Sequence, residues 1–178
     1  MAPRVGIVVV VFSLLAAGGC PPANGPGPGP SGSTLKLPAE VAGTWKAKES
    51  PWEIVLSRDG TVSSAVIPMG EVRISPNETT KVEMKDGSFS TYEAGDCLVE
   101  YTPASRELFV SIVMKEIHVV FLDNRIDGNS TDRFVGTVSE DGKVWTTDWI
   151  QVFDYGPRFP QDANDVGAAL LVFEKVEP

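Results

Sequence analysis

The sequence predicts an all-β domain of roughly eight to ten antiparallel strands, closed into an up-and-down barrel or, alternatively, folded into a β-sandwich. Three observations lead to this fold class. Short runs of β-branched and aromatic residues follow one another from residue 44 onward, Asp-Gly dipeptides separate several of them, and nothing beyond residue 33 repeats its apolar residues with a helical period. Asp-Gly is a strong signal for a hairpin turn, so neighbouring runs are expected to pair.

Two hairpins have the clearest signals. One covers residues 52–67 around Asp59–Gly60, and the other covers residues 134–150 around Asp141–Gly142. Both turns lie in the pattern Ser-x-Asp-Gly-x-Val, which we attribute to common hairpin chemistry rather than to duplication.

Further strands are predicted where β-branched and aromatic residues cluster, at residues 81–84, 88–92, 97–102, 107–122 and 167–176. Asp86–Gly87 and Asp127–Gly128 are predicted turns between such runs. The segment 107–122 is long for one strand, and Lys115–Glu116 interrupts its apolar residues. We therefore expect a bend, a bulge or a tight reversal at this charged pair.

The first 19 residues have the three parts of an export signal. Arg4 forms a short basic region, residues 5–17 are apolar, and small residues precede Cys20. The sequence Ala17-Gly18-Gly19-Cys20 resembles the bacterial lipobox, in which the cysteine receives a diacylglycerol and the signal is cut just before it. The resemblance implies a lipid anchor on Cys20. By the sorting tendency of that family, the resemblance also implies the outer membrane of the cell envelope, because Pro21 and not an acidic residue follows the cysteine.

Residues 20–33 read as a tether. After Cys20 this segment holds five prolines and four glycines, with no side chain that would bury apolar area. It would reach about 20 Å as a flexible coil and about 40 Å when extended. Residues 34–178 then form a single all-β domain of 145 residues, long enough for a core of its own.

Charge and cysteine content exclude several classes of protein. The formal net charge is -9, and removal of residues 1–19 would take away Arg4 and no acid, giving -10. Such an acidic chain is not expected to bind nucleic acid. With Cys20 lipidated, Cys97 has no intramolecular partner, so the fold is not held by disulfides, and its strand context predicts an inert, buried thiol.

A family resemblance appears at the start of the domain. Residues 37–42 suggest a short helical turn, and Gly43-Thr44-Trp45 follows it on the first predicted strand. Gly-x-Trp at this place, followed by a meander of hairpins, resembles the lipocalin and calycin barrels. In those folds the tryptophan packs across the closed end of the barrel, and an arginine from the last strands often covers it. The last predicted strand here offers Lys175 and no arginine.

Aromatic side chains are the best candidates for a binding site. Trp145, Trp149 and Phe153 fall on one face of a strand, and Trp45 and Tyr101 join them as predicted ligand-binding residues. The same pattern is also what a filled core uses, so both interpretations stay open.

No catalytic or metal-binding pattern stands out, and we expect neither enzymatic activity nor a cofactor. His118 is the only histidine, and its strand context favours a structural role. The oxygen-rich segments 123–132 and 161–165 invite a calcium site, but the first fails the EF-hand spacing, and polar turns explain both. The sequence therefore predicts a lipid-anchored envelope protein that binds a small apolar ligand or, alternatively, an envelope protein through a filled domain.

Overall fold

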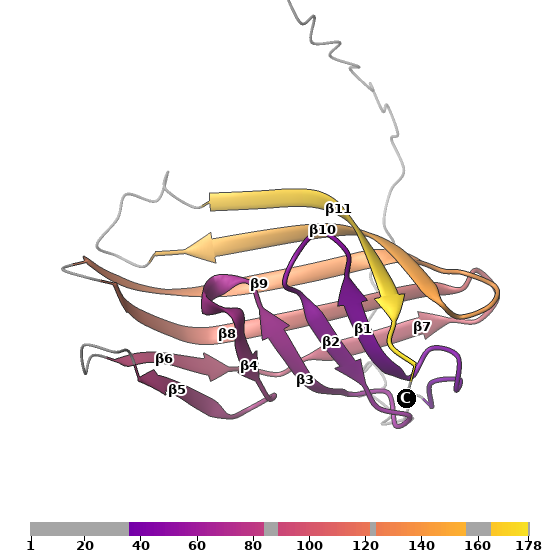
Figure 1. Ribbon diagram of the computed structural model, residues 1–178, viewed down its shortest axis with the longest axis horizontal. Helices are drawn as coiled ribbons and strands as arrows, with labels where there is room; N and C mark the ends of the chain where they lie inside the picture. The colour runs from indigo at the N-terminus through magenta and orange to yellow at the C-terminus, as the bar shows by residue number, and fades with distance from the viewer. Residues whose placement is uncertain (1–35, 84–88, 122–123, 156–164, 178) are drawn as a thin grey trace, which may run out of the picture. The chain divides into compact units, whose positions relative to one another are not determined.

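The computed structural model describes residues 36–83, 89–121, 124–155 and 165–177 (Figure 1). The predicted signal segment 1–19, Cys20 and the tether 20–33 lie outside the described residues. So do the predicted turn Asp86–Gly87 and most of the segment 161–165. Within the described residues no helix has the length and hydrophobicity needed to span a membrane.

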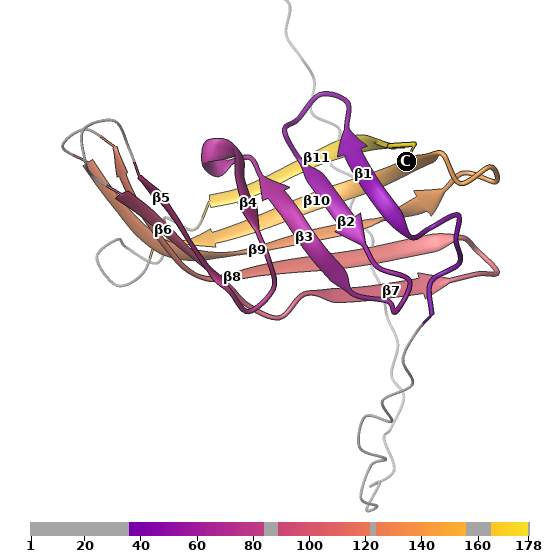
Figure 2. The same cartoon turned by 60° about the horizontal axis from the view of Figure 1, so that its bottom comes forward.

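The described residues form eleven strands and one 3-10 turn, in the order β1 (Gly43–Ala47), β2 (Glu53–Leu56), β3 (Val62–Ile67), η1 (Met69–Glu71), β4 (Val72–Ile74), β5 (Thr79–Glu83), β6 (Phe89–Ala94), β7 (Leu98–Thr102), β8 (Glu107–Phe121), β9 (Asn124–Val138), β10 (Val144–Asp154) and β11 (Asp165–Lys175). The predicted all-β class is confirmed. In Figures 1 and 2 the short strands β2–β4 lie across from the long strands β8 and β9, which extend beyond them, and β1 lies next to β11.

The strands form one antiparallel sheet that closes almost completely. Its order is β4-β3-β2-β1-β11-β10-β9-β8-β6-β5, with β7 paired to β8 off this path. Most strands therefore pair with their neighbours in the sequence, and the first strand pairs with the last, as Trp45 does with Lys175. Where β4 meets β5, Thr80 Oγ1 donates to the Arg73 carbonyl at 3.3 Å. This up-and-down order confirms the barrel, and the single sheet rules out the sandwich.

Two short strands share the length of β8. β7 pairs with residues 107–111 of β8 and β6 with residues 114–118, and Gly95 between them donates its N–H to the Val113 carbonyl at 2.7 Å. The register of β8 against β9 shifts between Met114 and Ile117. A bend, a bulge or a tight reversal was expected at Lys115–Glu116, and the structure has the bulge, within a single strand of 15 residues.

The Asp-Gly signals are correct at two turns and wrong at a third. Gly60 (φ 82°) and Gly142 (φ 68°) have the positive φ that favours glycine in the predicted hairpins. Asp127–Gly128 instead lies inside β9, as does the rest of the predicted polar turn from residue 124 to 132. A Cβ on Gly128 would approach the Phe153 ring to 2.7 Å, so this glycine makes room for a neighbouring strand.

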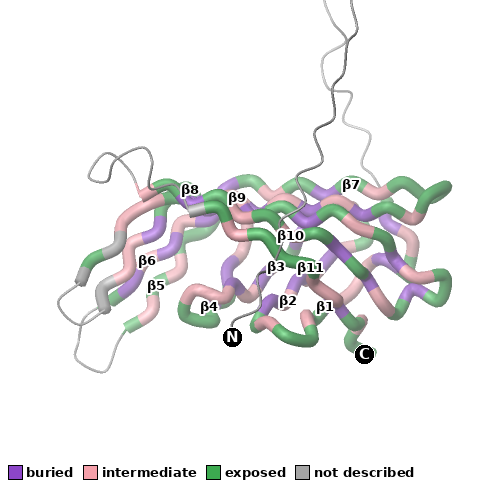
Figure 3. Tube along the Cα trace, turned by 90° about the horizontal axis from the view of Figure 1, so that it is seen from above, coloured by how far each residue is buried: buried purple, intermediate pink, exposed green. Residues whose placement is uncertain are grey.

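Aromatic rings fill one end of the barrel. Trp145 stacks on Phe173 at a centroid distance of 4.9 Å, and Phe134 contacts Trp52 edge to face at 5.0 Å. Trp45 is completely buried and lies edge to face with Trp145 at 6.2 Å. Buried and exposed residues alternate along the strands that surround these rings (Figure 3). The interior at this end is therefore a packed core.

Gly43-Thr44-Trp45 lies at this filled end, as the lipocalin resemblance implies. Trp45 Nε1 donates to the Val41 carbonyl at 2.8 Å, within the turn that precedes β1. Lys175 takes the place expected for an arginine, with its Nζ 5.8 Å from the centre of the Trp45 ring. Gly43 has a φ of 135°, and a Cβ there would lie 2.9 Å from Lys175 Cε. The glycine of the motif thus makes room for the lysine.

Candidate functional site

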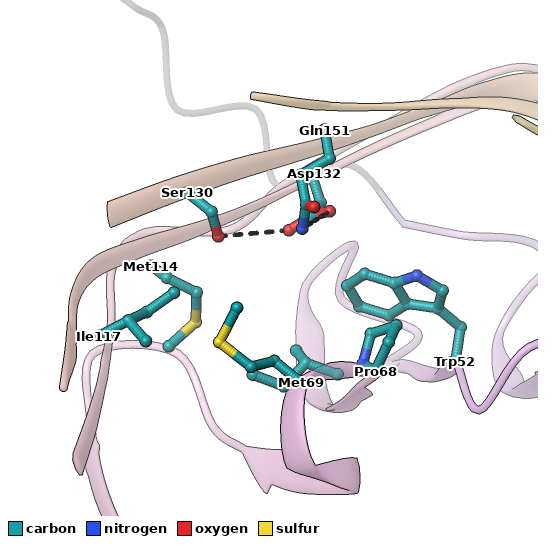
Figure 4. A pocket seen from close by; sticks show the side chains of 9 residues that line it. Trp52, Pro68, Met69, Met114, Ile117, Ser130, Asp132 and Gln151 are labelled. Carbon is teal, nitrogen blue, oxygen red and sulfur yellow. Dashed lines mark hydrogen bonds between the residues drawn. The ribbon is translucent and has the colours of Figure 1, made fainter. Parts of the chain in front are cut away.

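A cavity of about 320 Å³ lies inside the barrel (Figure 4). Its walls come from both the short and the long strands. The lining residues are Trp52, Ile67, Pro68, Met69, Met114, Ile117, Ser130, Asp132 and Gln151. The volume of the cavity is at the lower end of the range for small-molecule sites, which starts at about 300 Å³.

The apolar wall combines two regions that are distant in sequence. Pro68 and Met69 belong to the segment that links β3 to β4, where Gly70 and Glu71 have positive φ values of 78° and 51°. This tight turn brings Met69 to the cavity. Met114 and Ile117, which also line it, flank the β8 bulge. Met114 and Ile117 are three positions apart, a spacing that would place them on opposite faces of a regular strand, and the bulge keeps both side chains buried.

The polar wall consists of Ser130 and Asp132 from β9 and Gln151 from β10. Strand alternation turns both β9 residues inward, and Asp132 pairs in register with Gln151. Figure 4 shows these three side chains facing Trp52, Pro68 and Met69 across the cavity.

Neutral donors hold the Asp132 carboxylate, which is only 2 % exposed. Its Oδ1 accepts hydrogen bonds from Trp149 Nε1 and Gln151 Nε2, both at 2.9 Å. Its Oδ2 accepts a longer bond of 3.5 Å from Ser130 Oγ. Burial raises the pKa of Asp132 to about 6, although these three hydrogen bonds act to lower it. The site therefore contains a desolvated carboxylate that is ionised at neutral pH.

The predicted binding aromatics are not among the residues that line this cavity. Trp45, Trp145 and Phe153 are buried in the core, and Tyr101 and Trp149 are partly buried against it. Trp149 is connected to the site through its bond to Asp132. None of the five lines this cavity, and their role in binding a ligand stays a prediction.

Sequence reasoning missed the residues that form the polar wall. Ser130 and Asp132 alternate with Phe134 as inward positions of one strand, and this period of two was a usable signal. The Asp-Gly dipeptide next to them led to a turn prediction instead. Gln151 lies between Trp149 and Phe153 on the predicted aromatic face, so its inward direction also followed from the sequence.

His118 and Cys97 lie away from the cavity. His118 Nδ1 is 2.6 Å from Asp127 Oδ1, and Arg125 Nε is 2.7 Å from Asp127 Oδ2. The Arg125 and His118 hydrogen bonds lower the pKa of Asp127. Burial raises the pKa of the half-buried Cys97 thiol, which favours its protonated form. Among the described residues, no group of three or more His, Cys, Asp and Glu side chains could hold a metal ion.

A second candidate site lies on the outer surface of the barrel, on β9, β10 and β11. We call it the outer apolar patch, and it consists of the exposed residues Val135, Ile150, Val152, Val166 and Leu170. Ile150 and Leu170 also border a shallow hollow of about 410 Å³. Exposed apolar side chains that gather in this way are typical of contact surfaces.

Comparison with models of known families, with curated proteins and with solved structures found no match to this chain. The function is therefore argued from the geometry alone.

Proposed function

We propose that this protein is a lipid-anchored extracytoplasmic barrel that binds a small, largely apolar ligand. The single observation that supports binding is the cavity of about 320 Å³ between the short and the long strands. Its walls are mostly apolar, with a few polar groups gathered on one side, which is the usual composition of a small-molecule site.

The volume of the cavity limits the size of the ligand. A water molecule takes about 30 Å³ of liquid volume, so this space accommodates on the order of ten non-hydrogen atoms. The thioether side chains of Met69 and Met114 adapt readily to different shapes. The expected ligand is therefore a compact molecule and not a long-chain lipid.

The proposed location rests on the first 33 residues. An acylated Cys20 would hold the protein at a bacterial membrane, and Pro21 favours the outer one. The tether at residues 20–33 would let the barrel stand clear of the lipid headgroups and sample small molecules in the adjacent compartment. Several acyl chains on one residue make such anchoring stable, since each buried methylene contributes about 0.8 kcal/mol.

Native mass spectrometry of the protein extracted from membranes tests this proposal. We expect an N-terminal mass that corresponds to acylated Cys20, together with a retained small molecule. Met69→Trp fills the cavity and should abolish retention, whereas Leu98→Trp changes a residue that is 50 % exposed on β7 and should not. An unmodified Cys20 would contradict the anchor, and equal retention by both variants would contradict the cavity as the site.

The outer apolar patch favours a second function, a contact surface for an envelope protein. Ile150 is 44 % exposed and Leu170 is 67 % exposed, and they lie on paired strands. Cross-linking in intact cells would distinguish this function. Loss of cross-linked partners in Leu170→Lys, but not in the control Thr146→Lys on the exposed face of β10, would support it.

A further inference from the structure

We infer that the ligand of this cavity is a primary amine with a compact apolar body, and that the Asp132 carboxylate is its counter-ion. The inference rests on the proposed function and names the class of ligand. It depends on one property of the cavity, namely a buried acidic group among neutral partners.

Several acidic residues form ion pairs in the described structure, and Asp132 differs from these residues. Glu53 binds Lys46 and Arg73, and Glu174 binds Lys48, at the protein surface. Asp132 is buried, and its described hydrogen-bond partners Ser130, Trp149 and Gln151 are all neutral. Among the lining residues that the structure describes, none carries a positive charge. Burying a carboxylate without a cation is costly, and a bound ammonium would offset part of that cost.

The polar wall offers a primary ammonium three acceptors. Asp132 Oδ1 is occupied by two donors, but Oδ2 has only the long bond from Ser130 and keeps acceptor capacity. Ser130 and Gln151 line the same cavity, and each side chain has an oxygen that can accept a hydrogen bond. An ammonium has three N–H donors, which matches this set. The bonds from Trp149 and Gln151 hold the carboxylate in one orientation before a ligand arrives.

The opposite wall accommodates the body of the amine. Trp52, Ile67 and Met69 are apolar there, and Met114 and Ile117 close the side of the cavity. The indole of Trp52 also attracts cations through its ring face. With on the order of ten non-hydrogen atoms in total, the body is a short alkyl chain or a single aryl ring on a short chain.

The same arrangement disfavours other head groups. A fatty acid or a phosphate would place a second negative charge against Asp132, which is mostly ionised at pH 7 because its pKa lies near 6. An alcohol offers one donor and leaves the buried charge uncompensated. The cavity therefore selects by charge first and by shape second.

Equilibrium dialysis of the full chain in lipid nanodiscs tests the inference with octylamine, 1-octanol and octanoate, which have similar bodies. Empty nanodiscs correct for partitioning into lipid. We expect octylamine to bind at least tenfold more tightly than 1-octanol. The ammonium of octylamine is a charged donor to Asp132, whereas the hydroxyl of 1-octanol is a neutral donor. Octanoate should bind most weakly.

Two variants assign the effect to the carboxylate. Asp132→Asn keeps the shape of the side chain and should lower octylamine affinity at least tenfold while leaving 1-octanol within about twofold. Asp148→Asn is the matched control, since it removes the same charge from an exposed position on β10. It should change neither affinity. Retained 1-octanol binding shows that Asp132→Asn is folded.

The outcomes separate this inference from the proposed function. If octylamine and 1-octanol bind the wild-type protein equally, the amine inference is wrong and the apolar-ligand barrel stands. This comparison needs no variant, so a misfolded Asp132→Asn does not weaken it. If none of the three compounds binds above the level of the Met69→Trp variant, the proposed function fails, and the inference fails with it.

Discussion

The ammonium of Lys175 lies 5.8 Å from the centre of the Trp45 ring and donates hydrogen bonds to the carbonyl oxygens of Ala39 (2.8 Å) and Glu40 (2.9 Å). Trp45 donates to the Val41 carbonyl in the same turn. One side chain from the first strand and one from the last thus hold the turn that precedes β1. This arrangement links the two strands that close the barrel.

Replacing the lysine should weaken the closed end. Lys175→Met removes two hydrogen bonds to carbonyl oxygens and the cation over Trp45, so we expect the free energy of unfolding to fall by about 1–3 kcal/mol. Lys175→Arg retains donors and charge and should cost less than about 1 kcal/mol. Urea unfolding followed by tryptophan fluorescence measures both. Lys48→Met, which breaks a surface ion pair with Glu174, is the control and should change little.

Asp132 should make the stability of the domain depend on pH. Its pKa is about 6 in the folded protein and about 3.9 in an unfolded chain. Between these values the folded state binds more protons, so stability decreases as pH rises through this window and stays reduced above it. In the described part of the chain, Asp132 is the one acidic or basic residue of the cavity lining, and its neighbours Ile112, Trp149 and Gln151 are neutral.

Asp132→Asn should therefore stabilise the domain at pH 7.5 and not at pH 4. The pKa shift of Asp132 limits the gain in the free energy of unfolding to about 3 kcal/mol, because each unit of pKa corresponds to about 1.36 kcal/mol. Asparagine Oδ1 still accepts from Trp149 and Gln151, so the network is kept. Urea unfolding at the two pH values checks this expectation. An equal effect of the substitution at both values would show that the buried charge is not its cause.

Gly128 should tolerate no side chain. A Cβ there would lie 2.4 Å from the Asp154 carbonyl oxygen and 2.7 Å from the Phe153 ring, so the backbone or the ring would have to move. We expect Gly128→Ala to lower the free energy of unfolding by about 2 kcal/mol or more. Gly167→Ala is the matched control, because its Cβ would approach no closer than 3.3 Å, to the Trp149 ring. Thermal unfolding of the two variants should differ clearly.

Thiol titration should test the anchor and the environment of Cys97 together. The chain has two cysteines. If Cys20 is acylated, the denatured mature protein should react with one equivalent of a thiol reagent such as DTNB, and two equivalents would contradict lipidation. In the native protein at pH 8 Cys97 should react more slowly than after denaturation, since burial raises its pKa and limits access.

Local turn chemistry predicted much of the barrel but failed where pairing was stronger. Asp59–Gly60 and Asp141–Gly142 turn the chain as expected. The formation of such a hairpin depends on the residues of one tight turn and the two strands that it connects. Asp127–Gly128 has the same sequence signal but lies in β9, where it pairs with β8 through His118 and Ile117. A long partner strand outweighed the turn preference, and this competition is not visible in a short window of sequence.

The sequence by itself determined the all-β class, the meander of hairpins, the place of Gly43-Thr44-Trp45 and an irregularity at Lys115–Glu116. These features depend on alternation and turn chemistry among neighbouring residues. Only the tertiary structure decided that Lys175 covers Trp45 and that the space between Met69 and Asp132 is left open as a cavity. Barrel closure brings together residues that are far apart in the chain, and whether their side chains fill the space between them depends on packing in three dimensions.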